Sequence, residues 1–280
     1  MKLIDALLPY QMAFVKDAGQ AKIWLAARQI GKSFAVSYEA VDLATAGPRT
    51  NVLIVSASLR QSTEVLEKVK FWISLAKAGV SKKVVTKETS EEIRFANDSR
   101  IISLPANPDT IRGFSGHVFL DEFAFHGDSR KIWTSVAPII TRGFKIRITS
   151  TPNGKQNQFY DIWAHGQNWS RHETSIHDAQ AAGLAVDIET LRSTIRDPES
   201  WAQEYECKFV DEATAFLTYD LINLAEHVQA GVPGLAKDGP YFLGVDIGRR
   251  RDLTVLWVLE ELGDVLWTRE VSVLGKASFA

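Results

Sequence analysis

Cysteine is nearly missing from this 280-residue chain, which contains a single one, Cys207. One cysteine excludes both an intramolecular disulfide and a cluster of thiolate metal ligands. We therefore expect a protein of a reducing compartment, the cytoplasm.

Long apolar runs, internal repeats, biased segments and an excess of one charge are missing as well. No apolar run approaches the roughly 18 residues that span a membrane as a helix, so we expect no membrane partner. The chain is 45% hydrophobic and 24% charged, which is typical of a folded protein and excludes a disordered one. Its 32 basic and 34 acidic residues give a net charge of −2, unlike a small basic DNA-binding domain. A large enzyme that contacts nucleic acid through one groove remains compatible with this balance.

Short apolar runs alternate with helical patterns over the first two thirds of the chain. This alternation predicts an α/β fold with a mainly parallel sheet flanked by helices. A β-meander is expected over residues 83–104. The other expected strands are 23–26, 51–55, 117–120 and 145–149, and the expected helical regions are 33–46, 59–77 and 187–206.

Glycine and proline gather in residues 230–240, which is typical of a linker. Three further strands joined by tight turns are predicted after it, at 241–246, 253–259 and 265–273. About 40 residues are too few for a closed α/β domain, so this second domain is expected to be incomplete. The predicted domains are 1–210, a linker over 211–239, and 240–280.

Residues 26–33 read Ala-Ala-Arg-Gln-Ile-Gly-Lys-Ser and lie between a predicted strand and a predicted helix. A phosphate-binding loop needs inward-pointing backbone N–H groups, a lysine for the β- and γ-phosphates and a hydroxyl for Mg²⁺. Lys32 and Ser33 occupy the last two positions, whereas Ala26 stands where the common pattern has glycine. Gly-Lys-Ser alone also occurs by chance, so the strand-to-helix context carries the interpretation.

The second motif is the acidic pair Asp121-Glu122, which follows the apolar residues 118–120. In P-loop ATPases the first carboxylate holds Mg²⁺ through its water shell, and a following glutamate polarises the attacking water as a general base. The alternative is a strand that ends in a solvated acidic turn. Together the two motifs predict ATP hydrolysis, with ATP and Mg²⁺ bound.

Two arginines and one loop fit around this centre. Arg28 can reach the γ-phosphate from within its own subunit, or it can pair with a local carboxylate. Arg112 can serve the site of a neighbouring subunit, or it can contact DNA or solvent. Residues 149–154 end a strand with hydroxyl groups, which suits a γ-phosphate sensor, although a simple Pro-Asn-Gly turn is the alternative.

The whole combination resembles the large terminase subunit family, the DNA-packaging motors of tailed bacteriophages. Residues 112–116 (Arg-Gly-Phe-Ser-Gly) and 120–126 (Leu-Asp-Glu-Phe-Ala-Phe-His) are most similar to the Mu-like prophage branch. The resemblance covers nearly the whole chain and is specific in the order of its motifs. In this family a small residue at the first loop position is tolerated, so Ala26 is a minor departure.

The resemblance implies roles for individual residues. Leu8-Pro9-Tyr10-Gln11 is similar to the adenine-contacting motif, with Gln11 on the base, and Ser150 and Thr151 match the motif that couples hydrolysis to DNA movement. The implied catalytic residues are Glu122 with Arg28 or Arg112, and the implied Mg²⁺ ligands are Ser33 and Asp121. The implied nucleotide-binding residues are Gln11, Arg28, Gln29, Gly31, Lys32 and Ser33.

In the family the second domain is an RNase H-like nuclease that begins with a three-stranded meander. Residues 241–248 resemble its first strand, with Asp246 at the first metal-binding carboxylate. Two-metal hydrolysis with Mg²⁺ or Mn²⁺ needs further carboxylates from later elements. We therefore expect Asp246 to be a vestigial metal ligand and this chain to lack nuclease activity.

The resemblance also implies the partners: double-stranded DNA, a portal protein, a small terminase subunit and further copies in a homo-oligomeric ring. The expected location is the cytoplasm of the bacterial host, transiently on the procapsid. One alternative is a helicase-like ATPase acting on nucleic acid, which normally requires a second motor domain. The other is a non-catalytic prophage remnant that binds nucleotide or a partner.

Overall fold

The computed structural model describes residues 3–77, 84–210, 224–232, 239–248 and 253–275. The chain divides into two units, residues 1–215 and 216–280, which are described separately. Within the described residues no helix is long and apolar enough to cross a membrane.

A mixed sheet of eight described strands, in the order β3-β4-β5-β2-β6-β7-β1-β8, organises the first unit. Strands β5, β2, β6, β7, β1 and β8 run parallel to one another, while β4 pairs antiparallel with β5 and β3 pairs antiparallel with β4. Every residue of β1 and β7 is buried, as is typical of parallel strands covered on both faces. The strands are β1 (Ala21–Ala26), β2 (Asn51–Ser56), β3 (Val85–Glu88), β4 (Glu92–Phe95), β5 (Arg100–Pro105), β6 (His117–Asp121), β7 (Ile146–Ser150) and β8 (Ser170–Thr174).

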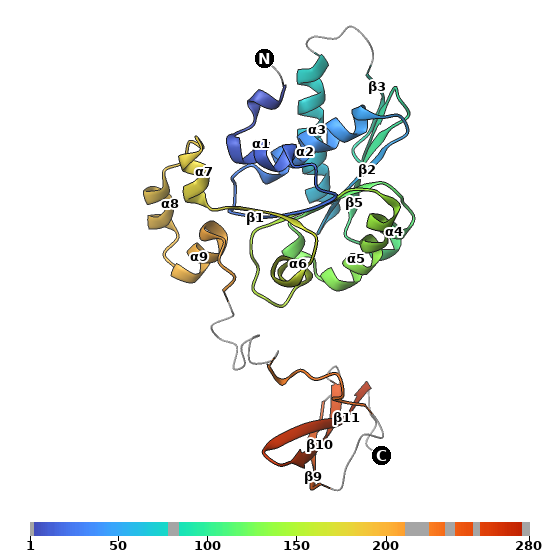
Figure 1. Ribbon diagram of the computed structural model, residues 1–280, viewed down its shortest axis with the longest axis vertical. Coiled ribbons are helices and arrows are strands. Elements are labelled where there is room, and N and C mark those ends of the chain that lie inside the picture. Colours follow the sequence, from blue (N-terminus) through green and yellow to red (C-terminus); the bar gives the residue numbers. More distant parts are fainter. Residues whose placement is uncertain (1–2, 78–83, 211–223, 233–238, 249–252, 276–280) are drawn as a thin grey trace. The chain divides into compact units, whose positions relative to one another are not determined.

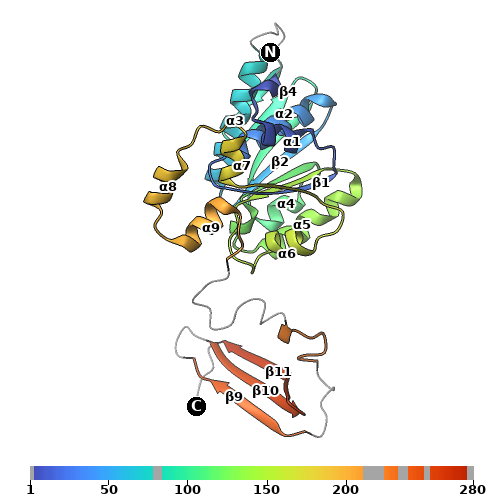
Figure 2. The ribbon, with the colours of Figure 1, turned by 60° about the vertical axis from the view of Figure 1, so that its left-hand side comes forward.

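Helices cover both faces of this sheet (Figures 1 and 2). One face carries α1 (Pro9–Lys16), α2 (Lys32–Ala46) and α3 (Leu59–Lys77), and the other carries α4 (Pro108–Arg112), α5 (Ser129–Val136) and α6 (Gln158–His165). Helices α7 (Ile176–Ala181), α8 (Ile188–Thr194) and α9 (Pro198–Glu206) follow β8. The short 3-10 helices are η1 (Leu3–Ala6), η2 (Phe123–Phe125) and η3 (Ala137–Arg142).

The elements expected from the sequence are present, and one of them is divided. Residues 187–206, expected as one helical region, form α8 and α9 instead. Asp197 precedes Pro198, which disfavours a helical backbone at Asp197. Its carboxylate caps α9 by accepting a hydrogen bond from the Ser200 N–H at 2.8 Å. Strand β8 and helices α1 and α4–α7 are additional to the expected elements.

Cys207 ends α9 in a left-handed conformation and is buried. Its thiol lies 3.3 Å from the Thr174 carbonyl oxygen, to which it donates. Burial raises the pKa of this thiol to about 12, so Cys207 is a packed thiol rather than a reactive one.

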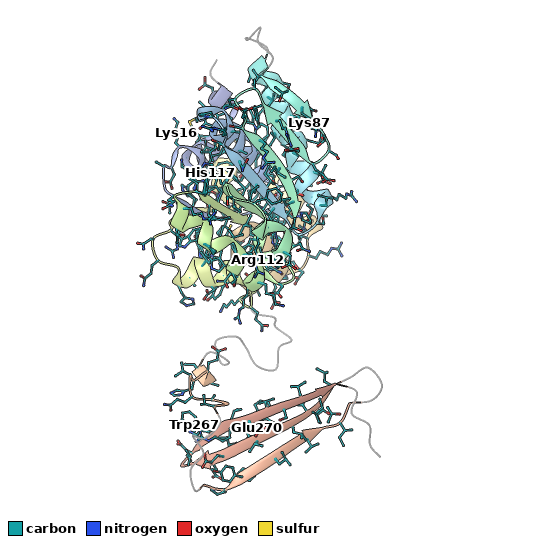
Figure 3. All side chains as sticks on the ribbon, turned by 90° about the vertical axis from the view of Figure 1, so that its right-hand side faces the viewer. Lys16, Lys87, Arg112, His117, Trp267 and Glu270 are labelled. Carbon is teal, nitrogen blue, oxygen red and sulfur yellow. The ribbon has the colours of Figure 1, made fainter. Side chains whose placement is uncertain are left out.

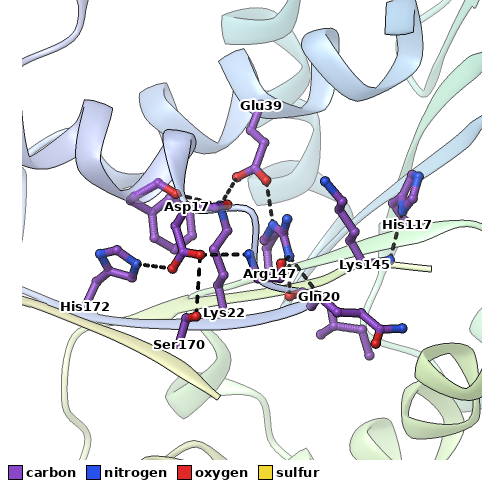
Figure 4. Close-up of polar contacts among 12 residues, drawn as sticks. Asp17, Gln20, Lys22, Glu39, His117, Lys145, Arg147, Ser170 and His172 are labelled. Carbon is purple, nitrogen blue, oxygen red and sulfur yellow. Dashed lines mark hydrogen bonds and ion pairs between the residues drawn. The ribbon is translucent and has the colours of Figure 1, made fainter. Parts of the chain in front are cut away.

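A buried group of charges connects α2 to the middle of the sheet (Figure 4). Glu39 on α2 accepts from Lys22 of β1 at 3.0 Å and from Arg147 Nε of β7 at 2.6 Å. Lys22 and Arg147 are register partners across the ladder, and neither side chain is exposed. Burial lowers the pKa of Lys22 to about 8, against the opposing effect of Glu39. The same side chains also hold the chain between α1 and β1.

That second contact runs through backbone oxygens. Lys22 Nζ donates to the carbonyl groups of Phe14 (2.5 Å) and Asp17 (3.0 Å), and Arg147 donates to those of Gly19 and Gln20. The carboxylate of Asp17 in turn lies 2.8 Å from His172 Nε2 on β8. The C-terminal end of α1 is therefore fixed to β1, β7 and β8.

The second unit contains an antiparallel sheet of β9 (Tyr241–Asp246), β10 (Leu253–Leu262) and β11 (Val265–Gly275), in the order β11-β10-β9. This confirms the predicted meander. A buried ion pair joins Glu260 and Arg269 on adjacent strands at 2.5 Å. Residues 211–223 and 233–238 of the predicted linker lie outside the described residues, and the domain boundaries at 210 and 240 stay predictions.

We predict that Glu39→Ala strongly destabilises the first unit. Removing the carboxylate leaves two buried cations without their counter-charge, a change that typically costs about 3–5 kcal/mol. Urea unfolding followed by tryptophan fluorescence measures this loss. Glu67→Ala, which removes an exposed partner of Lys70, serves as the control and should change the free energy of unfolding by less than about 0.5 kcal/mol. Equal unfolding midpoints for the two variants would contradict the prediction.

Candidate active site

The carboxyl ends of the parallel strands β1, β2, β6 and β7 meet at one edge of the sheet, where α/β proteins place their sites. In the strand register Leu25 lies opposite Ser150, and Asp121 lies opposite Thr149. This register brings the loop after β1, the acidic motif and the hydroxyl-rich loop after β7 together, although each comes from a distant part of the sequence.

The loop between β1 and α2 ends with a glycine, Gly31, in the left-handed backbone conformation. Gly31 has φ +85° and precedes the first residue of α2, Lys32. A Cβ at Gly31 would meet Gln11 Nε2 of α1, so both the backbone and the space require glycine here. Arg28 and Gln29 are exposed at the tip of the loop, and Ile30 is buried beneath it.

Lys32 and Ser33 contact the acidic motif directly. Lys32 Nζ donates to the Ala27 carbonyl oxygen at 3.1 Å and lies 3.2 Å from Glu122 Oε1. Ser33 Oγ donates to Asp121 Oδ2 at 3.0 Å. From the sequence these four residues were expected to act in one site, but no contacts between them were predicted. The structure brings their side chains together.

Asp121 is buried and held from both sides. Its second carboxylate oxygen accepts from Thr149 Oγ1 of β7 at 2.9 Å. Burial raises the pKa of Asp121, the charge of Glu122 raises it further, and the bond from Thr149, Lys32 and the bond from Ser33 oppose the shift. The carboxylate is thus fixed in position by two hydroxyl groups.

Glu122 has a left-handed backbone (φ +51°, ψ +48°), which is unusual for a residue other than glycine. Its Oε2 accepts from the Thr151 N–H at 3.2 Å and from Ser150 Oγ at 3.4 Å. His126 stabilises the same turn, with its Nε2 3.0 Å from the Asp121 carbonyl oxygen. The turn therefore directs Glu122 away from the strand and toward the loop after β7.

The donor set fits Mg²⁺. This ion prefers hard oxygen ligands and is usually bound by one or two carboxylates together with substrate phosphates. Ser33 Oγ and the Asp121 carboxylate supply such oxygens. Among the described residues there is no group of three or more histidine, cysteine, aspartate or glutamate side chains that could hold a metal ion, so water and phosphate oxygens would supply the other ligands.

The N-terminal motif lies against the loop. Gln11 Nε2 donates to the Ile30 carbonyl oxygen at 3.1 Å, and Tyr10 Oη donates to the same oxygen at 2.7 Å. Gln11 Oε1 accepts from the Leu8 N–H at 2.9 Å. The Gln11 amide is thus used to position α1 on the loop, and its role on adenine stays a prediction.

The two candidate arginines occupy different places. Arg28 donates its backbone N–H to the Glu204 carbonyl oxygen at 2.8 Å, and its side chain pairs with the Glu204 carboxylate at 3.4 Å. Arg112, labelled in Figure 3, is 60% exposed and pairs with Asp109 at 3.5 Å. Among the described contacts, neither arginine touches Lys32, Asp121 or Glu122.

Asp246, the candidate nuclease ligand, belongs to the second unit. It is the last residue of β9 and pairs in register with Val255 of β10. Its role as a metal ligand stays a prediction.

Two cavities border Glu122. One, of about 300 Å³, is lined by Arg28, Glu122 and Thr151 together with residues of α3 and α9. The other, of about 150 Å³, reaches Ser33 and Asp121. The site is thus open on two sides of the predicted general base.

Thr149 lies in the hydroxyl-rich strand end that the sequence marked as a γ-phosphate sensor, and in the structure it bonds Asp121. The contacts of two other residues were missed by the sequence reasoning. His126 and Glu204 carry no such signal, because their contacts depend on a local turn and on a distant helix.

Comparisons with known proteins identify a family and several relatives. The family model described as "Terminase large subunit, T4likevirus-type, N-terminal" matches residues 23–224. The Mu-like prophage FluMu protein gp28 of Haemophilus influenzae is 28% identical over 210 residues, covering 70% of this chain and 41% of that protein. The probable terminase large subunit gp28 of Escherichia phage Mu is 26% identical over 268 residues, covering 83% and 49%. The chain thus spans less than half the length of either relative.

Solved structures show the same fold. The large terminase ATPase domain of Thermus phage P74-26 has a TM-score of 0.59 at 22% identity, covering 75% of this chain and 96% of that one. The large terminase of a thermophilic bacteriophage, solved in complex with ADP, has a TM-score of 0.58 at 13% identity, covering 95% and 68%. These likenesses confirm the predicted α/β fold with a mainly parallel sheet.

We predict that Gly31→Ala destabilises the first unit more than Gly143→Ala. Both residues have a left-handed backbone, φ +85° and φ +80°, which costs about 1–2 kcal/mol for alanine. Only the Cβ at position 31 meets another group, Gln11 Nε2, whereas nothing lies within 4 Å of the one at position 143. Displacing Gln11 should add about 1 kcal/mol through its lost hydrogen bond.

Thermal unfolding of the two variants measures the difference. Adding Gln11→Ala should bring the cost of Gly31→Ala close to that of Gly143→Ala, because the clash is then relieved. Two single variants with the same melting temperature would refute the steric argument.

Proposed function

The chain belongs to the terminase large subunit family, and on that premise we propose that its first unit is a Mg²⁺-dependent ATPase that translocates double-stranded DNA into a procapsid. Terminase large subunits act in DNA-packaging complexes. The contact of Ser33 Oγ with Asp121 Oδ2 at 3.0 Å, beside Glu122, is the observation that carries the proposal. It joins the phosphate-binding loop to the acidic motif in one site.

The nucleotide is proposed to bind along the loop. The backbone around Gly31 and the N-terminus of α2 receive the phosphates, and Lys32 contacts the β- and γ-phosphate oxygens. Arg28 and Gln29, exposed at the loop tip, border the same phosphates. Gln11 is proposed to contact adenine at the other end of the nucleotide.

Ser33 and Asp121 would hold Mg²⁺, which neutralises charge on the β- and γ-phosphates. Glu122 then takes a proton from a water molecule as the water oxygen bonds to the γ-phosphorus. The bond between the γ-phosphorus and the bridging oxygen breaks, and its electron pair stays on ADP. Hydrogen bonds from Ser150 and Thr151 hold Glu122 in place for this step.

These two residues are also proposed to couple hydrolysis to DNA movement. When Glu122 takes up a proton, its carboxylate loses its negative charge. The hydrogen bonds that it accepts from the Thr151 N–H and Ser150 Oγ are then weakened. The loop that follows continues to Gly154, whose N–H donates to Gln203 of α9 at 3.0 Å. The loop that begins at Thr151 is thus bonded at one end to Glu122 and at Gly154 to α9.

The remaining charge on the γ-phosphate is proposed to be stabilised by an arginine. Arg28 lies in the loop of the same subunit, whereas the exposed Arg112 is suited to reach a neighbouring subunit in a homo-oligomeric ring. A portal protein and a small terminase subunit are the other proposed partners. The proposed location is the host cytoplasm, transiently on the procapsid.

We predict that Glu122→Gln abolishes ATP turnover without abolishing ATP binding. Losing a general base typically costs about 10²–10⁴-fold in rate, whereas the amide keeps the size of the side chain. Mg²⁺-ATP turnover, measured with and without double-stranded DNA, and the affinity for a fluorescent ATP analogue test the two halves of this statement. Glu189→Gln, an exposed substitution on α8, is the matched control and should retain wild-type turnover.

The same assay over a range of protein concentrations separates the arginines. Specific turnover that rises with concentration points to Arg112 acting on a neighbouring subunit, and constant specific turnover points to Arg28. A wild-type chain that binds ATP but hydrolyses it under none of these conditions would overturn the proposed function.

For the second unit, we predict that neither the chain nor its Asp246→Ala variant cuts plasmid DNA in Mg²⁺ or Mn²⁺. Two-metal cleavage requires several converging carboxylates, and Asp246 is the single candidate that the sequence motif supplies. Agarose-gel analysis of supercoiled plasmid checks this outcome. Metal-dependent cutting that disappears in Asp246→Ala would show that the site is functional.

A further inference from the structure

Polar side chains from β2 and from the start of α3 face Glu122 across the smaller cavity. Its lining joins Ser33, Asp121 and Glu122 to Ser56 and Gln61. Gln61 also lines the larger cavity on the other side of Glu122. None of the roles described above uses Ser56 or Gln61.

Ser56 is the last residue of β2 and follows Val55, the register partner of Leu120, so it lies beside Asp121. Its side chain is 1% exposed, and its Oγ has no hydrogen-bond partner among the described residues. Two other hydroxyls, those of Ser33 and Thr149, already donate to Asp121. A buried hydroxyl without a partner is costly, so Ser56 Oγ is expected to bond a group inside the cavity.

Gln61 is oriented by the N-terminus of α3. Its Oε1 accepts from the Ser58 N–H at 3.2 Å, and Ser58 Oγ accepts from the Gln61 N–H at 3.3 Å, which together form a capping box. Ser58 and Gln61 are both exposed, and Ser58 Oγ also donates to Gln61 Oε1 at 3.3 Å, so the amide oxygen is turned toward Ser58. The Nε2 group is then left as a donor, and within the described part of the chain it donates to no other residue.

The charge of the cavity favours water over an anion. Three carboxylates, Glu64, Asp121 and Glu122, line it against one ammonium group, Lys68. A volume of about 150 Å³ also exceeds the roughly 30 Å³ that one water occupies in the liquid. The cavity therefore has both the polarity and the room for ordered water beside the base.

Building on the ATPase activity proposed above, we propose that Gln61 Nε2 and Ser56 Oγ, with Glu122, hold the water molecule that attacks the γ-phosphate. The water donates one proton to Glu122 and one to Ser56 Oγ, and it accepts a hydrogen bond from Gln61. Its second lone pair is then directed at the γ-phosphorus. When the new P–O bond forms, the proton on Glu122 leaves the water and the bridging oxygen of ADP keeps the electron pair of the broken bond.

Gln61→Glu tests the donor without disturbing the helix cap. A glutamate accepts from Ser58 N–H as glutamine does, so the capping box and the melting temperature are retained. The Nε2 donor is lost, and kcat should fall at least about tenfold while the KM for ATP and the affinity for a fluorescent ATP analogue change less than about twofold. Gln61→Ala should lower kcat to a similar degree, which separates loss of the donor from the added negative charge.

Ser56→Ala tests the second contact, because it removes a hydroxyl that bonds no described protein group. It should lower kcat by about threefold or more with unchanged analogue affinity. Since both side chains hold the same water, the double variant Ser56→Ala/Gln61→Glu should lose less than the product of the single losses. Thr63→Ala, whose hydroxyl bonds only the Leu59 carbonyl oxygen on α3, is the control and should retain wild-type kinetics.

A readout independent of turnover is a crystal structure of the chain with ADP, Mg²⁺ and aluminium fluoride. We expect the water molecule that is bound axially to aluminium to lie within hydrogen-bond distance of Gln61 Nε2, Ser56 Oγ and Glu122. A structure in which Gln61 contacts only Ser58 would overturn the inference.

The outcomes separate this inference from the proposed function. If neither wild type nor Thr63→Ala hydrolyses ATP, the proposed function fails, and the inference with it. If both hydrolyse ATP and Gln61→Glu matches them, the ATPase stands and the water-holding role is wrong. If the Gln61 variants raise KM and analogue Kd with unchanged kcat, Gln61 binds a phosphate in the ground state, which also overturns the inference.

Discussion

The carboxylate of Glu39 fixes the position of α2 on the sheet, and the site depends on that position. It binds Lys22 of β1 and Arg147 of β7, two strands that are direct neighbours. Glu39 is seven residues, or about two turns, after Lys32, so both side chains project from nearly the same face of the helix. Anchoring the middle of α2 therefore sets the height and rotation of its N-terminus, where Lys32 and Ser33 meet the acidic motif. We therefore expect a substitution of Glu39 to affect ATP hydrolysis indirectly, by moving Lys32 and Ser33 at the N-terminus of α2.

Three hydroxyl groups surround Asp121, from Ser33 of α2, Thr149 of β7 and Ser56 of β2, and they differ in their hydrogen bonds. Those of Ser33 and Thr149 donate to the carboxylate and hold it rigidly, as a metal ligand requires. The third, on Ser56, is buried without a described partner and opens on the cavity beside Glu122. The surroundings of Asp121 thus supply both a fixed carboxylate, the proposed Mg²⁺ ligand, and a polar group without a described partner near Glu122, the proposed general base. All three residues carry a hydroxyl group. Ser33 and Thr149 differ from Ser56 because their hydroxyl groups donate to Asp121.

Much of the fold and many of the site residues could be predicted from the sequence. Contacts between residues distant in the sequence could not. Strands β1 and β7 each contain an apolar core of residues, and the motifs after them have recognisable spacing, so both were predictable. Strand β8, Ser-Arg-His-Glu-Thr, is polar and lies at the sheet edge, where no apolar run marks it. His126 and Glu204 reach the site through a left-handed turn and a distant helix, which no local pattern encodes. Residues 58–61 match the Ser-x-x-Gln pattern of a capping box, but that pattern predicts only the start of a helix and not a role for Gln61 in the site.

Gly31 and Gln11 divide one small volume between α1 and the loop. The glycine leaves room for the amide nitrogen, and the amide in turn bonds the carbonyl oxygen of Ile30. Neither residue is therefore free to drift alone over evolutionary time. A larger residue at position 31 would displace the Gln11 amide in addition to straining the backbone, and a shorter residue at position 11 would remove one of the two side-chain hydrogen bonds from α1 to the Ile30 carbonyl oxygen. Substitutions at these two positions, twenty residues apart, are therefore expected to be coupled.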